Sequence, residues 1–128
     1  IDIVLTQPES VVKKPGETVR ISCVVKGFDI SNYGINWVKQ VPGKGLEWLL
    51  YVRSPNVKAF ALELKARFTA SVVSNIASIE ITSLITLTPA LYYCARGADR
   101  ELDGWGSGTF LEVTPVTQAA PSVYIPNP

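Results

Sequence analysis

Hydrophobic and polar side chains alternate with a period of two along several segments of the chain. In segment 18–25, one face carries only apolar side chains: Val19, Ile21, Cys23 and Val25. Segments 78–82 and 109–113 alternate in the same way. This period is typical of antiparallel strands that bury one face and expose the other. The pattern therefore predicts a sheet structure in which each of these segments contributes one strand.

Turn-forming residues separate the alternating segments at short intervals. They occur at residues 14–16, 42–45, 54–56, 104 and 106–108, where Gly, Pro and Asn cluster. Short strands at such spacing predict an all-β sandwich or barrel. After Thr114 the composition changes, because segment 115–128 carries four of the nine prolines. Proline cannot donate to a strand ladder, so this segment is predicted to be a linker followed by the opening of another domain.

Composition limits the classes of function. The chain has 128 residues, which suits one domain, and a net charge of +1. Because positive and negative charges nearly cancel, the chain has no overall electrostatic field that would attract nucleic acid or anionic lipid. No apolar stretch is long enough to span a membrane. The chain has no His, the commonest general base and metal ligand, so we expect neither catalysis nor a cofactor.

Two cysteines, Cys23 and Cys94, lie far apart in the sequence. Taken alone, they are either two buried thiols or one disulfide, depending on the compartment. Trp37 follows Cys23 by 14 residues, and Tyr92 precedes Cys94 by two. This Cys, Trp and Tyr-x-Cys pattern resembles the immunoglobulin sandwich. The resemblance implies that the cysteines form a disulfide between two sheets and that Trp37 and Tyr92 lie in the core.

Three further motifs make the resemblance more specific. Residues 43–48 read GKGLEW, residues 94–96 read CAR, and residues 105–109 read WGSGT. Together they resemble the variable domain of an antibody heavy chain, and segments 5–17 and 27–30 are most similar to heavy chains of fishes. The resemblance implies a V-type Greek-key β-sandwich of about nine strands over residues 1–114. Segment 120–124 resembles the start of a truncated constant domain.

The resemblance also implies a set of functional residues. Three loops at one end, 27–34, 52–58 and 97–104, would contact a ligand through Asn32, Tyr33, Arg53, Asn56, Asp99, Arg100 and Glu101. One outer sheet face, here called the pairing face, would pack on another V domain through Val38, Gln40, Leu46, Trp48, Tyr93 and Trp105. Arg96 and Asp103 would form a salt bridge at the base of the third loop. The alternatives are solvated loop residues and scattered surface hydrophobics.

These residues predict an extracellular recognition domain, secreted or part of a receptor ectodomain. It would bind an antigen or ligand and pair with a light-chain-like V domain or with a second copy of itself. Thr88 stands where heavy chains usually carry an Asp, which leaves a second hypothesis: a non-rearranging innate or adhesion receptor that homodimerises. The loop acids Asp99, Glu101 and Asp103 could also be interpreted as catalytic or as a calcium site, but solvated acids are the stronger interpretation.

Overall fold

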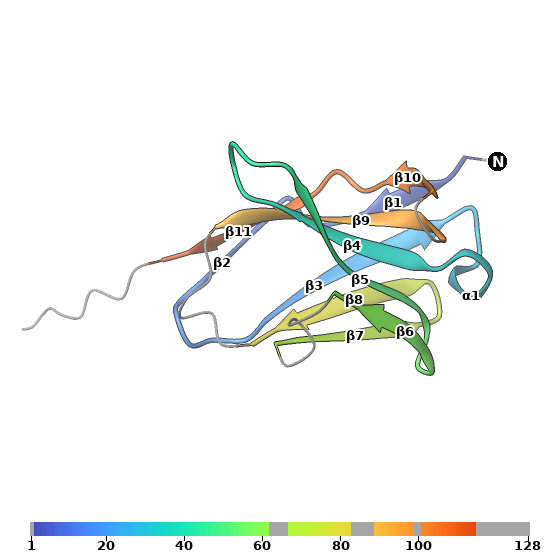
Figure 1. The fold of residues 1–128 in the computed structure, drawn as a ribbon, viewed down its shortest axis with the longest axis horizontal. Helices are drawn as coiled ribbons and strands as arrows, with labels where there is room; N and C mark the ends of the chain where they lie inside the picture. The colour runs from blue at the N-terminus through green and yellow to red at the C-terminus, as the bar shows by residue number, and fades with distance from the viewer. Residues whose placement is uncertain (1, 62–66, 83–88, 99–100, 115–128) are drawn as a thin grey trace, which may run out of the picture.

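Two β-sheets packed face to face form the molecule (Figure 1). The computed structural model describes residues 2–61, 67–82, 89–98 and 101–114. The four-stranded sheet has the order β1–β3–β8–β7, with β1 Val4–Thr6, β3 Val19–Lys26, β8 Ile76–Ile81 and β7 Phe68–Val73. This is the V-type sandwich that the sequence predicted.

The second sheet has seven strands in the order β2–β11–β9–β4–β5–β6, and β10 also pairs with β9. Its strands are β2 Ser10–Lys13, β4 Ile35–Gln40, β5 Leu46–Ser54, β6 Val57–Phe60, β9 Ala90–Ala98, β10 Glu101–Trp105 and β11 Thr109–Val113. Every pairing in the two sheets is antiparallel except that of β11 with β2.

The described residues form eleven strands, whereas about nine were predicted. Segment 4–13 forms two strands on either side of Gln7 and Pro8, so that β1 joins the four-stranded sheet and β2 joins the other. Proline cannot donate to a ladder, which explains a break at this position. The predicted strand 109–113 is β11, as expected, whereas β10 lies mostly in segment 97–104, which was predicted as a loop.

The core lies between the sheets and contains the apolar faces that the period-two pattern predicted. Val19, Ile21 and Cys23 of β3 are buried, as are Ile79 and Ile81 of β8. The paired registers place Ile21 beside Ile79 and Val19 beside Ile81. These cross-strand pairs keep the apolar face of one strand aligned with that of the next.

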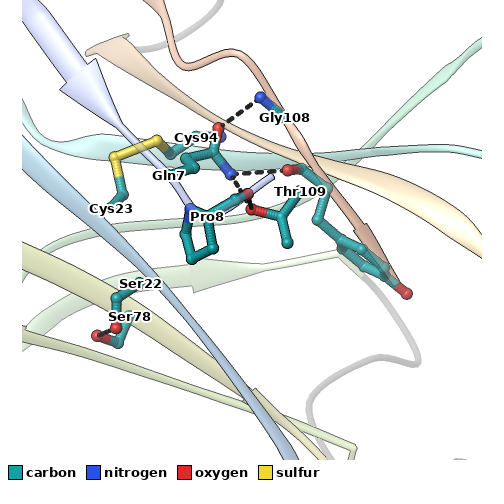
Figure 2. Close-up of a disulfide and its surroundings, with 9 residues drawn as sticks. Gln7, Pro8, Ser22, Cys23, Ser78, Cys94, Gly108 and Thr109 are labelled. Atoms are coloured by element: carbon teal, nitrogen blue, oxygen red, sulfur yellow. Dashed lines mark hydrogen bonds between the residues drawn. A yellow bond between two sulfur atoms is a disulfide. The ribbon is translucent and has the colours of Figure 1, made fainter. Parts of the chain in front are cut away.

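A disulfide between Cys23 of β3 and Cys94 of β9 joins the two sheets through the core (Figure 2), with 6.4 Å between the Cα atoms. Trp37 and Tyr92, both from the seven-stranded sheet, are fully buried in the same core cluster. Burial, followed by the charge of Glu47, raises the pKa of the Tyr92 hydroxyl to about 12. Neither the Trp37 indole nor the Tyr92 hydroxyl makes a hydrogen bond within the described residues.

Gln7 connects the first strand of the chain to the last ones, which the sequence did not predict. Its Nε2 donates to the Tyr92 carbonyl at 2.8 Å and to Thr109 Oγ1 at 3.1 Å. Its Oε1 accepts from the backbone N–H groups of Cys94 at 3.2 Å and Gly108 at 3.1 Å. Figure 2 shows the Gln7 amide between the disulfide and Thr109. Both N–H groups of the buried Gln7 amide and both acceptor positions of its oxygen therefore have partners.

Four predicted features fall outside the described residues. They are Thr88, Asp99, Arg100 and the predicted linker of segment 115–128. No helix in the described ranges is long and apolar enough to cross a membrane.

Candidate ligand-binding loops and pairing face

Three connections of the chain gather at one end of the sandwich, on the right in Figure 1. They are the helix α1, Ile30–Tyr33, the turn between β5 and β6, and the neighbouring ends of β9 and β10. The short helix was not predicted. Asp29 caps it by accepting from the Ser31 N–H at 3.1 Å, the usual role of an Asp at this position.

Gly34 ends the helix with a φ of 78°, a backbone conformation that favours glycine. The ring of Tyr51 lies against it, so that a Cβ at Gly34 would come within 2.3 Å of Tyr51 Cε1. Two independent constraints, the positive φ and the neighbouring Tyr51 ring, therefore favour glycine here.

The second and third loops are shorter than predicted. Segment 52–58 was predicted as a loop, but β5 continues to Ser54 and β6 begins at Val57. Segment 97–104 contains the end of β9 and most of β10, paired from Gly97 to Leu102. Strand pairing reaches Ser54 and Val57 in the β5–β6 hairpin and Ala98 and Glu101 between β9 and β10, so the described residues of both segments are largely strand.

The predicted ligand residues that the structure describes are accessible. Asn32, Tyr33, Asn56 and Glu101 are exposed, and Arg53 is half-buried. They come from α1, from the β5–β6 hairpin and from β10, so residues distant in sequence share one end of the molecule. Among the described residues, no group of three or more His, Cys, Asp or Glu side chains is placed to hold a metal ion.

Arg96 and Asp103 form the predicted salt bridge at the base of the third loop. Arg96 Nε donates to Asp103 Oδ1 at 2.9 Å, and Nη2 donates to Oδ2 at 2.5 Å. The bond is therefore bidentate, which fixes the orientation of both groups. The hydrogen bond from Arg96 holds the pKa of the Asp103 carboxyl below its usual range, and the same bond raises the pKa of Arg96.

The guanidinium of Arg96 also lies over two aromatic rings of the first loop. Its Cζ is 4.2 Å from the ring centroid of Tyr33 and 5.2 Å from that of Phe28. Both distances are within the range of cation–π attraction. The two rings meet edge to face at 5.9 Å. Arg96 therefore connects the first loop to the third, a contact between loops that sequence spacing could not reveal.

The predicted pairing face lies on the outer side of the seven-stranded sheet. Three large apolar side chains are exposed there: Leu46 by 57%, Trp105 by 44% and Trp48 by 40%. Trp105 meets the half-buried Tyr93 edge to face, with 6.0 Å between the ring centroids. Gln40 is half-buried and donates from Nε2 to the Lys44 carbonyl at 3.1 Å.

Val38 does not contribute exposed surface to the pairing face, contrary to the prediction. It alternates with the core residue Trp37, which places it on the outer side, but it is only 3% exposed. It pairs with Trp48 on one side and with Tyr93 on the other. A central strand position between two large aromatic residues leaves little surface for a valine, so Val38 lies beneath the face.

Asn36 is a buried polar residue beneath this face that the sequence analysis missed. Its Oδ1 accepts from Trp48 Nε1 at 2.9 Å, and its Nδ2 donates to the Gly97 carbonyl at 2.8 Å. The sequence did contain a signal for this residue: Asn36 alternates with Val38 and Gln40 along one strand, and both of its neighbours in the sequence are buried. Period alone assigns such a residue to the outer face and does not reveal that other residues cover it.

Comparison with known proteins agrees with this geometry. The immunoglobulin V-set domain family matches residues 6–114. An IgW heavy chain V region of Heterodontus francisci is 54% identical over 118 residues, which cover 91% of this chain and 100% of that protein. An Ig heavy chain V region of Mus musculus is 38% identical over 122 residues, covering 86% of this chain and 97% of that protein. An Ig heavy chain V-A2 region of Oryctolagus cuniculus is 37% identical over 105 residues, covering 79% of this chain and 77% of that protein.

These matches confirm the predicted resemblance to heavy chains, including those of fishes, since one of the relatives comes from a shark. V regions are not enzymes, which agrees with the absence of catalysis expected from the sequence. The two-sheet fold, the inter-sheet disulfide and the matched range all agree with an immunoglobulin V-set domain. The chain therefore belongs to the immunoglobulin V-set family, and it is an immunoglobulin heavy-chain variable domain.

Proposed function

We propose that this heavy-chain variable domain binds an antigen through the loop end and pairs with a second V domain through the pairing face. The observation that supports pairing most directly is the exposed surface of Leu46, Trp48 and Trp105 on the outer side of the seven-stranded sheet. Apolar side chains gathered on one face of a soluble domain usually mark an interface. Heavy chains pair within antibodies, and the finer question is which V domain covers this face.

A second copy of the chain is the partner we propose for the isolated domain, and a light-chain-like V domain is the alternative. Fully burying one large apolar side chain contributes roughly 1.5–3 kcal/mol, and three such side chains are available. Gln40 uses one N–H within its own loop. Its other N–H and its Oε1 could exchange hydrogen bonds with the same residue of a partner across a two-fold axis.

Light scattering over a range of concentrations tests this proposal with two matched variants. We expect the unmodified domain to form dimers and Leu46→Arg to be monomeric, because the variant would bury an unpaired charge. Val73→Arg is the control, since Val73 is 67% exposed on the four-stranded sheet. It should dimerise as the unmodified domain does. A monomer at every concentration would contradict the homodimer and leave the pairing face for a light-chain-like domain.

The proposed ligand site comprises Asn32, Tyr33, Arg53, Asn56 and Glu101, together with Asp99 and Arg100. Aromatic, amide and charged side chains on a rigid scaffold are typical of antibody paratopes. Sequencing several transcripts from one animal tests the role of the third loop. Diverse residues between Arg96 and Asp103 would support antigen recognition. One invariant segment would instead support the innate or adhesion receptor.

We also propose an extracellular location, either in a secreted antibody or in the outer part of a membrane-bound one. The Cys23–Cys94 disulfide supports this location, because such bonds persist in oxidising compartments.

A further inference from the structure

The buried amide of Asn36 joins two surfaces that the proposed function uses separately, the pairing face and the third loop. Asn36 lies in β4 and is 1% exposed. It accepts from the Trp48 indole at 2.9 Å and donates to the Gly97 carbonyl at 2.8 Å. Trp48 belongs to the pairing face, and Gly97 belongs to the base of the third loop.

The chemistry of the two partners fixes the orientation of this amide. An indole N–H can only donate, and a backbone carbonyl can only accept. A rotation of the amide by 180° would therefore oppose two donors at Trp48 and two acceptors at Gly97. Because both bonds depend on the same planar group, displacing the indole changes the position of the atom that holds Gly97.

A bulge in β5 sets the register of Trp48 along the outer face. Trp37 pairs with Leu50, and the next residue, Val38, pairs with Trp48, so Leu49 is the extra residue. Leu49 and Leu50 are both buried in the core, which regular alternation would not allow. Bulges commonly redirect a side chain, and this one changes which residues of β5 face outward next to Asn36.

Gly97 is a restricted point at the base of the third loop. Its φ is 144°, and a Cβ there would lie 2.1 Å from the Glu101 carbonyl oxygen. It pairs with Leu102 across the β9–β10 hairpin. The preceding residue, Arg96, holds Asp103 on the same hairpin. Two consecutive residues of β9 therefore anchor the third loop, one through its side chain and the other through its carbonyl.

We propose that Asn36 is a positioning residue that couples occupation of the pairing face to the conformation of the third loop. A V domain packed on Trp48 restricts the indole, and the indole restricts Asn36 and the Gly97 carbonyl. Coupling between two sites is reciprocal, so a ligand that orders the third loop strengthens pairing by the same factor. This inference rests on the proposed function, in which the same two surfaces bind a partner and an antigen.

The first experiment needs neither a partner nor a ligand. It compares amide hydrogen exchange in β10 by NMR for the whole chain and for Trp48→Phe, which removes the indole donor and keeps an aromatic ring. Loss of one hydrogen bond should accelerate β10 exchange about three- to tenfold. Asn36→Leu, which removes both bonds and keeps the branching at Cγ, should accelerate it at least as much.

Leu46→Ala is the matched control, since Leu46 lies in the same strand and on the same face, and all variants are compared below the concentration at which the domain self-associates. It should leave β10 exchange within about twofold of the unmodified domain. If Trp48→Phe also leaves β10 unchanged while Asn36→Leu accelerates it, the indole transmits nothing and the proposal is wrong. Equal acceleration by Leu46→Ala and Trp48→Phe would overturn it too, because the effect would then be general loosening of the face.

The second experiment measures β10 exchange below and above the concentration at which the domain self-associates. Association should slow exchange in the unmodified domain about threefold more than in Asn36→Leu, the effect of one hydrogen bond. Equal slowing in both would overturn the coupling, since direct burial would then explain it. If no self-association occurs, the proposed homodimer fails, and the first experiment still decides the role of Asn36.

Discussion

The outer faces of the two sheets differ, although the same alternation of residues builds both. On the four-stranded sheet, neighbouring outward residues are short or pair with one another. Ser22 and Ser78 share a hydrogen bond at 2.9 Å, and Arg20 contacts Glu80 at 3.1 Å. Val24 is the apolar member of the same strand and is about as exposed as Trp48. Both of these polar pairs are satisfied within one molecule.

On the seven-stranded sheet, the exposed residues Leu46, Trp48 and Trp105 are larger, and one of them is bonded to a buried polar group. Trp48 presents its ring to solvent and its N–H to Asn36. Exposed fraction therefore does not distinguish the two faces. The distinguishing features are the area that each side chain offers and the hydrogen bonds that fix its orientation. An interface can be inferred where a large apolar side chain is held in place from below.

The disulfide that underlies both faces should give the largest effect. Cys23→Ala combined with Cys94→Ala opens a loop with a sequence separation of 71, and a bond closing a loop of that length stabilises by about 4 kcal/mol. Urea unfolding of the variant and of the reduced, unmodified domain should give similar losses. If one face unfolded before the other, the two sheets would not form one cooperative unit.

The buried polar groups beneath the two faces should differ in their contribution. Asn36→Ala leaves the Trp48 N–H and the Gly97 carbonyl without their partner, which should cost about 2–4 kcal/mol of unfolding free energy. Ser78→Ala removes one bond between neutral hydroxyls and should cost about 1 kcal/mol. Chemical denaturation of both variants measures the difference. Equal losses would mean that the two faces are supported alike.

Alkaline unfolding should report on the core side of the seven-stranded sheet. Because the pKa of Tyr92 is raised to about 12 in the folded domain, its neutral hydroxyl stabilises the fold fully below pH 10. This contribution is lost as the pH rises from about 10 to about 12, by about 2–3 kcal/mol. Tyr92→Phe should remove that part of the pH dependence. A pH profile unchanged by the substitution would contradict it.

The smallest effect is expected from the exposed ion pair on the four-stranded sheet. Arg20 and Glu80 are both substantially exposed, so solvent screening should leave a coupling of about 0.2–1 kcal/mol. A double-mutant cycle of Arg20→Ala and Glu80→Ala measures it, and the coupling should fall further at high salt. A larger, salt-independent coupling would show that this face is more tightly organised than its geometry indicates.

The sequence predicted the fold well because the alternation directly reflects burial. Val19, Ile21 and Cys23 carry that signal, and the Cys, Trp and Tyr spacing identified the inter-sheet bond. The additional strands were missed because β1 and β2 join different sheets and because β10 lies mostly in segment 97–104, which was predicted as a loop. Pro8 marks the boundary between β1 and β2, but a proline in the sequence does not say that the chain changes sheets there.

The candidate site was predicted less completely. The salt bridge of Arg96 and Asp103 followed from the resemblance, but its contact with Tyr33 depends on how the first loop folds over the third. Val38 was assigned to the correct side of the sheet, and only packing shows that it is covered. Asn36 was missed because its role depends on the β5 bulge, and a bulge changes pairing register without leaving a clear mark in the sequence.

The hydrogen bonds of Gln7 have a consequence for the order in which the domain is made. Three of its four partner residues belong to segment 92–108 and the fourth is Thr109, so the amide is satisfied only after almost the entire domain has been synthesised. Contacts this distant in sequence form slowly because the intervening chain must first be closed into a loop. β1 can already pair with β3, but Gln7 after it is satisfied, and β2 is paired, only once β11 has formed. A nascent chain released before residue 109 would leave β2, whose partner is β11, as an unpaired strand open to association with other chains.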